Sequence, residues 1–183
     1  MKNISLTLTF VLFINTLLFS AITDNNISSL QYATQKKTKI RWVELSDVQE
    51  LMAKKPKKVL MLFYRQNCPY CKEMKETTLQ DPEVVKLVND NFYAVMVDGK
   101  TKEALTFMGE TYLNDHPNPE DKPWIHNLYR KYVEPYNGGY YWPSTVIFDK
   151  NLNKEKSFPG LQKTVQFKRL LKIYSQDRNK KSR

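Results

Sequence analysis

Hydrophobic residues form short continuous runs in some parts of the chain and follow helical spacing in the parts between them. Val59–Tyr64 is apolar at every position, which predicts a central strand buried on both of its faces. Phe92–Val97 and Thr145–Phe148 predict two further strands, and Glu155–Phe158 predicts an edge strand. The pattern therefore predicts a mixed sheet whose strands are separated by helices.

Helix signals occupy the segments between these strands. A Ser, Thr or Asp cap marks a helix start, as does proline at the first helical position, where its missing N–H group has no intrahelical partner. The order of elements predicts an α/β helix–sheet–helix sandwich. The predicted helices begin at Asp47 (with Ser46 and Gln49 as a capping box), run from Pro69 to about Thr78, begin at Pro82 after the N-cap Asp81, and follow a Thr164 cap through Phe167, Leu170, Leu171 and Tyr174.

Residues 99–140 interrupt this order before the third predicted strand. They contain a predicted hairpin that turns at Gly109, a predicted helix over Trp124–Tyr132, and a loop or bend over Tyr136–Trp142. We interpret this segment as an insertion in the sandwich.

The insertion is rich in aromatic side chains, for which two interpretations stay open. They either form a hydrophobic shelf for a substrate or partner, or they pack the insertion onto the sheet. The two histidines of the sequence, His116 and His126, are interpreted as surface residues rather than catalysts. The aromatic residues concerned are Trp124, Tyr129, Tyr132, Tyr136, Tyr140 and Tyr141.

The first twenty residues have the pattern of a secretory signal peptide. Lys2 supplies a positive start, Ile4–Phe19 is mostly apolar, and Ser20 and Ala21 are small, as a cleavage site requires. The apolar stretch is shorter than the ~20 residues of a spanning helix, which favours a cleaved leader over a membrane anchor. We therefore expect a periplasmic or otherwise exported protein. The predicted divisions are a signal peptide (1–20), a flexible lead-in (21–39), a folded domain (40–176, with the insertion at about 99–140) and a basic tail (177–183).

The chain is strongly basic, with a formal net charge of +10. Much of this charge is scattered along the sequence, and no nucleic-acid-binding module is recognisable, so no nucleic-acid partner is expected. A solvated basic surface is the favoured interpretation. A weak attraction to anionic lipid or to an acidic partner stays open.

Cys68 and Cys71 are the only two cysteines, and they lie between a predicted buried strand and a predicted helix. A bridge between such near neighbours removes little unfolded-state entropy, so the pair indicates chemistry rather than structural crosslinking. A zinc site lacks further ligands at suitable spacing, and c-type haem attachment lacks a histidine after Cys71. No metal and no cofactor is therefore predicted. Redox chemistry is favoured over a coincidental pair of buried core cysteines.

The position of the pair at a helix start assigns the two cysteines different roles. Exposed N–H groups at the helix N-terminus stabilise a thiolate, so Cys68 is the predicted nucleophile. Cys71 lies one turn further into the helix, where it is expected to be more buried and to resolve the mixed disulfide that Cys68 forms. Pro69 and Tyr70 form the active-site loop and set its stiffness, and lysines on the same helix add positive potential.

These motifs together resemble the exported thioredoxin-like proteins of bacteria over roughly residues 40–175. The resemblance implies a thioredoxin-like fold, with the 99–140 segment inserted before the strand that follows a cis-proline. The segments that carry the resemblance are Phe63–Met74, Asp81–Val84, Asn91–Asp98, Trp142–Asp149 and Pro159–Gly160.

The resemblance also implies that Trp142 and Pro143 bind substrate. In this fold a cis-proline faces the cysteine pair, and the residue before it offers its backbone to the substrate chain. Two positions depart from thioredoxins proper: Leu62 stands where they carry a buried Asp, and Asn67 stands where they carry Trp. Proton transfer at Cys71 must then use water or another group. The Pro-Tyr dipeptide is the one that glutaredoxins use, which favours a reduction potential of about −200 mV.

The sequence therefore predicts a thiol–disulfide oxidoreductase that acts on protein thiols and disulfides in the cell envelope. Its predicted partners are those protein substrates and an unidentified redox partner, for which a membrane protein is one option. The alternative is a thioredoxin-like binding or chaperone module with incidental redox activity, since the buried Asp is missing and the insertion is large. A weaker third option is a metal-handling protein that uses both thiolates.

Overall fold

Strand β1 (Lys58–Tyr64) lies inside a mixed sheet with the strand order β2-β1-β5-β6. The computed structural model describes residues 38–115 and 124–176. β1 pairs in parallel with β2 (Phe92–Asp98) and antiparallel with β5 (Ser144–Phe148), and β6 (Lys154–Pro159) forms an edge. β1 is buried from Lys58 to Phe63, because helices cover both faces of the sheet, as its continuous apolar run predicted.

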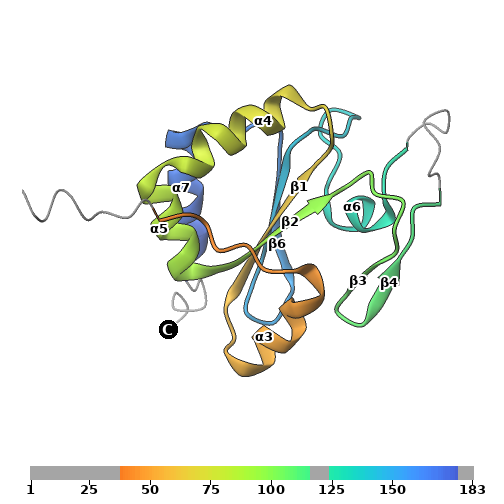
Figure 1. Cartoon of the computed structure of the whole chain (residues 1–183), viewed down its shortest axis with the longest axis horizontal. Helices are drawn as coiled ribbons and strands as arrows, with labels where there is room; N and C mark the ends of the chain where they lie inside the picture. The colour runs from red at the N-terminus through yellow and green to blue at the C-terminus, as the bar shows by residue number, and fades with distance from the viewer. Residues whose placement is uncertain (1–37, 116–123, 177–183) are drawn as a thin grey trace, which may run out of the picture. The chain divides into compact units, whose positions relative to one another are not determined.

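Two groups of elements cover the two faces, each with its own hydrophobic cluster (Figure 1). Leu60 and Leu62 of β1 belong to one cluster, and Met61 and Phe63 belong to the other, as the alternation of side chains along a strand requires. The first face carries α4 (Pro69–Glu76), α5 (Pro82–Asn91) and α7 (Thr164–Ser175), and the second carries α3 (Val48–Lys54), α6 (Asn127–Tyr132) and the hairpin β3 (Leu105–Phe107) to β4 (Glu110–Tyr112).

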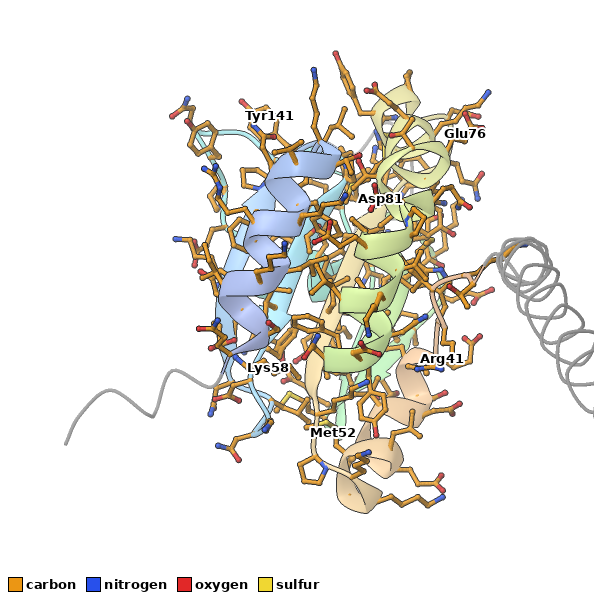
Figure 2. All side chains as sticks on the ribbon, turned by 90° about the vertical axis from the view of Figure 1, so that its left-hand side faces the viewer. Arg41, Met52, Lys58, Glu76, Asp81 and Tyr141 are labelled. Carbon is orange, nitrogen blue, oxygen red and sulfur yellow. A yellow bond between two sulfur atoms is a disulfide. The ribbon has the colours of Figure 1, made fainter. Side chains whose placement is uncertain are left out.

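The two ends of the sheet are occupied differently. Figure 2 shows Lys58 and Met52 at one end and Tyr141 and Glu76 at the other. Lys58 begins β1, and its buried ammonium group lies 2.9 Å from Glu155. The polypeptide leaves β1 at the opposite end, which is where the cysteine pair follows.

Several predicted helix starts hold in the structure. Pro82 opens α5 after Asp81, whose Oδ1 accepts hydrogen bonds from the N–H groups of Glu83 and Val84 at 3.0 and 3.1 Å. Pro69 opens α4, which ends at Glu76 and is followed by the 3-10 helix η2 (Thr78–Gln80).

Other helix predictions are corrected. Ser46 lies inside the 3-10 helix η1 (Leu45–Asp47), so the predicted capping box is not formed and α3 begins at Val48. Thr164 is the first residue of α7 rather than its cap, because Lys163 occupies the N-cap position. α6 begins only at Asn127, which leaves Trp124 outside the helix predicted to contain it.

The predicted hairpin of the insertion is present. Met108 and Gly109 connect β3 and β4 with φ angles of 56° and 76°, the left-handed pair that a two-residue hairpin turn requires. Phe107 and Tyr112 point inward, where their rings contact the ring of Tyr132. The hairpin therefore packs on the sheet through α6.

The signal peptide (1–20), almost all of the lead-in (21–39), the basic tail (177–183) and His116 lie outside the described residues. Within residues 38–115 and 124–176, no helix combines the length and the apolar character needed to cross a membrane.

Candidate active site

The cysteine pair stands where β1 passes into α4. Cys68 is the N-cap of α4 in extended conformation, and its Sγ accepts a hydrogen bond from the Cys71 N–H at 3.1 Å. Pro69 follows at the first helical position, as predicted. One backbone N–H group of this helix end is thus directed at the Cys68 sulfur, which is an arrangement that stabilises a thiolate.

Cys68 and Cys71 are joined by a disulfide bond. Cys68 is 7% exposed and Cys71 is 3% exposed, so the first cysteine is the more accessible of the two. This order matches the prediction that Cys71 is the more buried of the two cysteines.

A pocket of about 620 Å³ lies over the disulfide. Its walls come from the loop after β1 and from the exposed side of α4. Asn67, in that loop, has a φ of 53°, a left-handed conformation that asparagine tolerates better than most residues. The pocket is lined by Tyr64, Arg65, Gln66, Asn67, Cys68, Pro69, Cys71, Lys72, Lys75 and Glu76.

Two lysines of α4 line this pocket in different environments. Lys75 lies with its Nζ 3.7 Å from the ring centroid of Tyr64, and burial lowers the pKa of its ammonium group while Asp98 opposes that change. Lys72 is exposed and faces Glu76 at 3.9 Å. Lys75 is therefore the less hydrated of the two charges.

Pro143 lies at the same end of the sheet as the cysteine pair. The Trp142–Pro143 peptide bond is cis, which confirms the geometry that the resemblance implied. Ser144 follows and pairs with Phe63, so Pro143 is placed beside the carboxyl end of β1, from which the chain continues to Cys68. The pairing thus brings the cis-proline and the cysteine loop to the same end of the sheet.

The side chain of Trp142 is held by packing. Its ring stacks on Tyr129 with centroids 4.3 Å apart and an interplanar angle of 29°, and it also lies against Gly99. The Tyr129 hydroxyl donates to the Tyr141 carbonyl oxygen at 2.8 Å, and burial raises the pKa of Tyr129 to about 12. The indole ring is therefore held by packing against Tyr129 and Gly99.

The aromatic residues of the insertion divide between the two interpretations. Tyr129 is fully buried and Tyr132 packs against Phe148, so these two fix the insertion to the sheet. Tyr136 and Tyr141 are 57% and 43% exposed, with ring centroids 6.0 Å apart.

His126 is completely buried, which corrects its interpretation as a surface residue. Its Nδ1 accepts a hydrogen bond from the Leu128 N–H at 3.1 Å, so His126 caps α6. Its Nε2 lies 3.1 Å from the carbonyl oxygen of Glu103 and donates to it in this tautomer. A single histidine beside a short helix carries no periodic signal, which is why the sequence did not reveal this role.

Leu62 has no carboxylate beside it in the sheet. It pairs with Met96 on β2 and with Thr145 on β5. Within the part of the chain that the structure describes, no group of three or more His, Cys, Asp or Glu residues is arranged to hold a metal ion.

Residues 45–174 match the family model described as a thioredoxin-like domain. A thioredoxin from Thermus thermophilus is 22% identical with a TM-score of 0.52, and the match covers 74% of this chain and 87% of that one. A thioredoxin-fold protein from Helicobacter pylori is 21% identical with a TM-score of 0.51, covering 70% of this chain and 74% of the other. No curated protein matches the chain significantly.

The solved structures show the fold alone at these identities, whereas the family model extends over most of the chain. The matched residues include both cysteines of the disulfide at the start of α4 and the cis-proline before β5. The structure places these features at one end of a mixed sheet. The chain thus belongs to the family of thioredoxin-like domains.

Proposed function

We propose that this protein is a thiol–disulfide oxidoreductase that acts on protein thiols and disulfides in the cell envelope. The observation that carries the proposal is the Cys68–Cys71 disulfide, which lies at the N-terminus of α4 and lines an open pocket. A structural crosslink of this spacing would add little stability, and it would not need access to a pocket.

The reduced protein acts as a reductant in two steps. The Cys68 thiolate attacks one sulfur of a substrate disulfide, whose S–S bond breaks, and the other substrate sulfur leaves as a thiolate that takes up a proton. Cys71 then loses its proton and attacks Cys68 in the mixed disulfide, which releases the second substrate thiol. Two electrons pass from the protein to the substrate, and Cys68 and Cys71 end as a disulfide.

The same steps in reverse make the oxidised protein a disulfide donor. The Cys71 N–H group and the end of α4 stabilise the Cys68 thiolate in both directions, because it is the attacking group in one and the leaving group in the other. The redox partner therefore decides the direction. A membrane-bound electron donor makes the protein a reductase, and an oxidising partner makes it an oxidase.

The cell-envelope location rests on the leader pattern of residues 1–20. Trp142 and Pro143 are proposed to bind the substrate chain, because the register of β1 and β5 brings them to the end of the sheet that carries Cys68.

The decisive experiment separates the two cysteines. With a peptide disulfide, Cys71→Ser is expected to accumulate a mixed disulfide at Cys68, detected by mass spectrometry, and Cys68→Ser is expected to form none. Equilibration of the native protein in glutathione buffers then gives the potential, expected at about −200 mV; a value near −270 mV indicates a reductase and one at about −120 to −180 mV an oxidase or isomerase. A pair that never exchanges with the peptide refutes the enzyme.

Two exposed aromatic features favour a binding or chaperone module as the second candidate. Tyr136 and Tyr141 form a solvent-exposed pair on the insertion, and Tyr70 between the cysteines is 62% exposed. Such rings provide contact area for unfolded chains. Replacing both cysteines by serine discriminates the candidates, because suppression of substrate aggregation survives in a binding module and the redox activity does not.

A further inference from the structure

A second pocket adjoins the one that holds the disulfide. It has a volume of about 550 Å³ and shares the wall formed by Arg65, Gln66 and Asn67. Its other residues come from the loop after β2 and from the insertion, and they are Asp98, Lys100, Thr101, Lys102, Glu103 and Trp124.

Three cations of this pocket have no carboxylate partner among the described residues. Arg65, Lys100 and Lys102 take part in none of the ion pairs within residues 38–115 and 124–176. The Nζ atoms of Lys100 and Lys102 lie 5.0 and 5.9 Å from the ring centroid of Trp124, within cation–π range. Burial and the nearby Arg65 lower the pKa of Lys100 while the charge of Asp98 opposes this change, so two like charges and one carboxylate lie close together.

The two carboxylates of the pocket leave this positive charge in excess. Asp98 accepts a hydrogen bond from the Lys100 backbone N–H at 2.9 Å rather than from its ammonium group, and Glu103 is exposed. The indole Nε1 of Trp124 is enclosed and has no acceptor in the described part of the chain. The Trp124 ring therefore contributes a wall of the pocket and a surface for the two lysines, and the ligand-facing charge comes from the cations.

The insertion holds the loop that carries the two lysines. The His126 backbone N–H donates to the Gly99 carbonyl oxygen at 2.9 Å, and the His126 ring bonds to the carbonyl oxygen of Glu103. The Asn114 side chain donates to the carbonyl oxygen of Thr101 at 2.9 Å. Residues 99–103 are therefore fixed at three backbone positions, so the cations are presented from a preorganised loop.

We propose that this second pocket binds acidic residues that flank the reacting cysteine of a protein substrate. The proposal rests on the oxidoreductase function and names its preferred substrate class. A carboxylate meets cations there without an ion-pair partner among the described residues, while the neighbouring cysteine of the same polypeptide reaches Cys68 in the adjoining pocket. A polypeptide extends across both pockets, whereas a small thiol needs only one. A single pocket of this volume is already large enough for a small molecule.

The test compares two peptide disulfides that differ only in the residues beside the cysteine, Glu in one and Gln in the other. The reduced protein is expected to exchange about three- to tenfold faster with the Glu peptide at low ionic strength, because each surface charge pair contributes modestly. Added salt shrinks this ratio. The double variant Lys100→Gln/Lys102→Gln brings the ratio close to one.

A matched control carries the same change of charge elsewhere. Lys131 and Lys163 are exposed and line neither pocket, so Lys131→Gln/Lys163→Gln keeps the preference for the Glu peptide. Equal rates for the two peptides with the native protein overturn the proposal, as does a preference that survives in Lys100→Gln/Lys102→Gln. Two small disulfides provide a further comparison, the anionic 5,5′-dithiobis(2-nitrobenzoate) and the neutral dithiodipyridine. If the ratio of their exchange rates exceeds the ratio for the Glu and Gln peptides, the pocket serves small thiols instead of polypeptides.

A binding measurement separates failure of this pocket from failure of the oxidoreductase function. Cys68→Ser/Cys71→Ser protein is titrated with Glu and Gln peptides whose cysteines are replaced by serine, so no thiol chemistry takes part. Tighter binding of the Glu peptide supports the pocket even where exchange is absent. Exchange with the Gln peptide reports on the oxidoreductase alone.

Discussion

Leu62 and Thr145 face each other across strands β1 and β5, directly below the helix that carries the cysteines. Opposed residues of an antiparallel pair share a sheet face, and Leu62 belongs to the cluster that contains Met74 of α4. Thr145 is fully buried, and its hydroxyl has no hydrogen-bond partner in the described part of the chain. The polar group absent at Leu62 is thus replaced by an unpaired hydroxyl on the adjacent strand.

Replacing Thr145 by valine is expected to make the protein more stable without changing its redox chemistry. An unpaired buried hydroxyl costs about 1–3 kcal/mol, so Thr145→Val raises the free energy of unfolding of the oxidised protein by about 1 kcal/mol. Thr145 makes no hydrogen bond to Cys71 in the disulfide-bonded structure, so resolution of the mixed disulfide is expected to keep its rate and its pH profile. Denaturation and rapid-quench kinetics check the two expectations.

Thr78 provides the control for this variant. It is equally buried, but its hydroxyl donates to the Gln162 carbonyl oxygen at 2.9 Å. Thr78→Val therefore lowers the free energy of unfolding by about 1 kcal/mol and leaves the pH profile in place. A pH profile that moves in Thr145→Val would contradict this expectation and would show that the hydroxyl bonds to Cys71 once the disulfide is reduced.

Gly99 makes room for the Trp142 ring. A Cβ atom at Gly99 would lie 2.5 Å from Cη2 of Trp142 and 2.9 Å from Cδ2 of Tyr129. Gly99→Ala is expected to lower the free energy of unfolding by about 1–3 kcal/mol, because the stacked rings must shift. It should also slow peptide exchange, since Trp142 precedes the cis-proline. Urea denaturation followed by tryptophan fluorescence checks the first effect.

Gly139→Ala is the matched control, as the nearest atom to its added Cβ is 3.6 Å away. This distance is ordinary contact, so the variant should retain native stability to within about 0.5 kcal/mol. Equal losses in the two variants would show that the space beside Gly99 is not what determines the effect of the substitution.

Local pattern was sufficient to predict the sheet and most helices. The unbroken apolar run at Val59–Tyr64 has one reasonable interpretation, and the proline at position 69 marks a helix start regardless of the surroundings. The cis bond at Pro143 followed from resemblance rather than from composition. These features depend on neighbours in sequence, which explains their success.

Features that depend on tertiary contacts were missed. The burial of His126 depends on two hydrogen bonds: the Glu103 carbonyl oxygen accepts one from its ring, and the Leu128 N–H donates one to its ring. Neither partner lies at a sequence spacing that a periodic pattern would mark. Thr164 resembles an N-cap in sequence, yet Lys163 takes that position. Arg65 and Lys100 line the same pocket because the loop after β1 and the loop after β2 meet there.

His126 predicts a loss of stability toward acid. Burial lowers its pKa below the ordinary 6.5, although its bond to Glu103 and the charge of Asp115 oppose this. As pH falls below 6.5, the unfolded chain takes up a proton before the folded one does, so the free energy of unfolding declines until pH reaches the folded pKa. Above 6.5 both states are neutral and the contribution is constant.

The measurement is chemical denaturation between pH 7.5 and about 5, above the range in which most carboxylates titrate. His126→Asn is expected to be less stable at neutral pH, because a smaller side chain leaves the ring's site unfilled, but to lose the decline between these pH values. The other histidine serves as the control, since His116→Asn should keep it. A decline of the same size in His126→Asn would assign it to a different group.

Lys75 and Lys72 should influence the Cys68 thiolate unequally. Both line the disulfide pocket, but Lys75 is partly buried over Tyr64, while Lys72 is exposed opposite Glu76. A less hydrated charge acts through a lower effective dielectric. Lys75→Met is therefore expected to slow alkylation of Cys68 in the reduced protein by about two- to fivefold at pH 6, where thiolate is scarce. Lys72→Met should slow it by less than half as much, as solvent and Glu76 already screen that charge.

Iodoacetamide modification followed by mass spectrometry, repeated across pH, measures the thiolate fraction directly. Equal slowing by the two variants would contradict the prediction, and unchanged alkylation in both would mean that the helix end alone, through the Cys71 N–H group, determines the reactivity of Cys68.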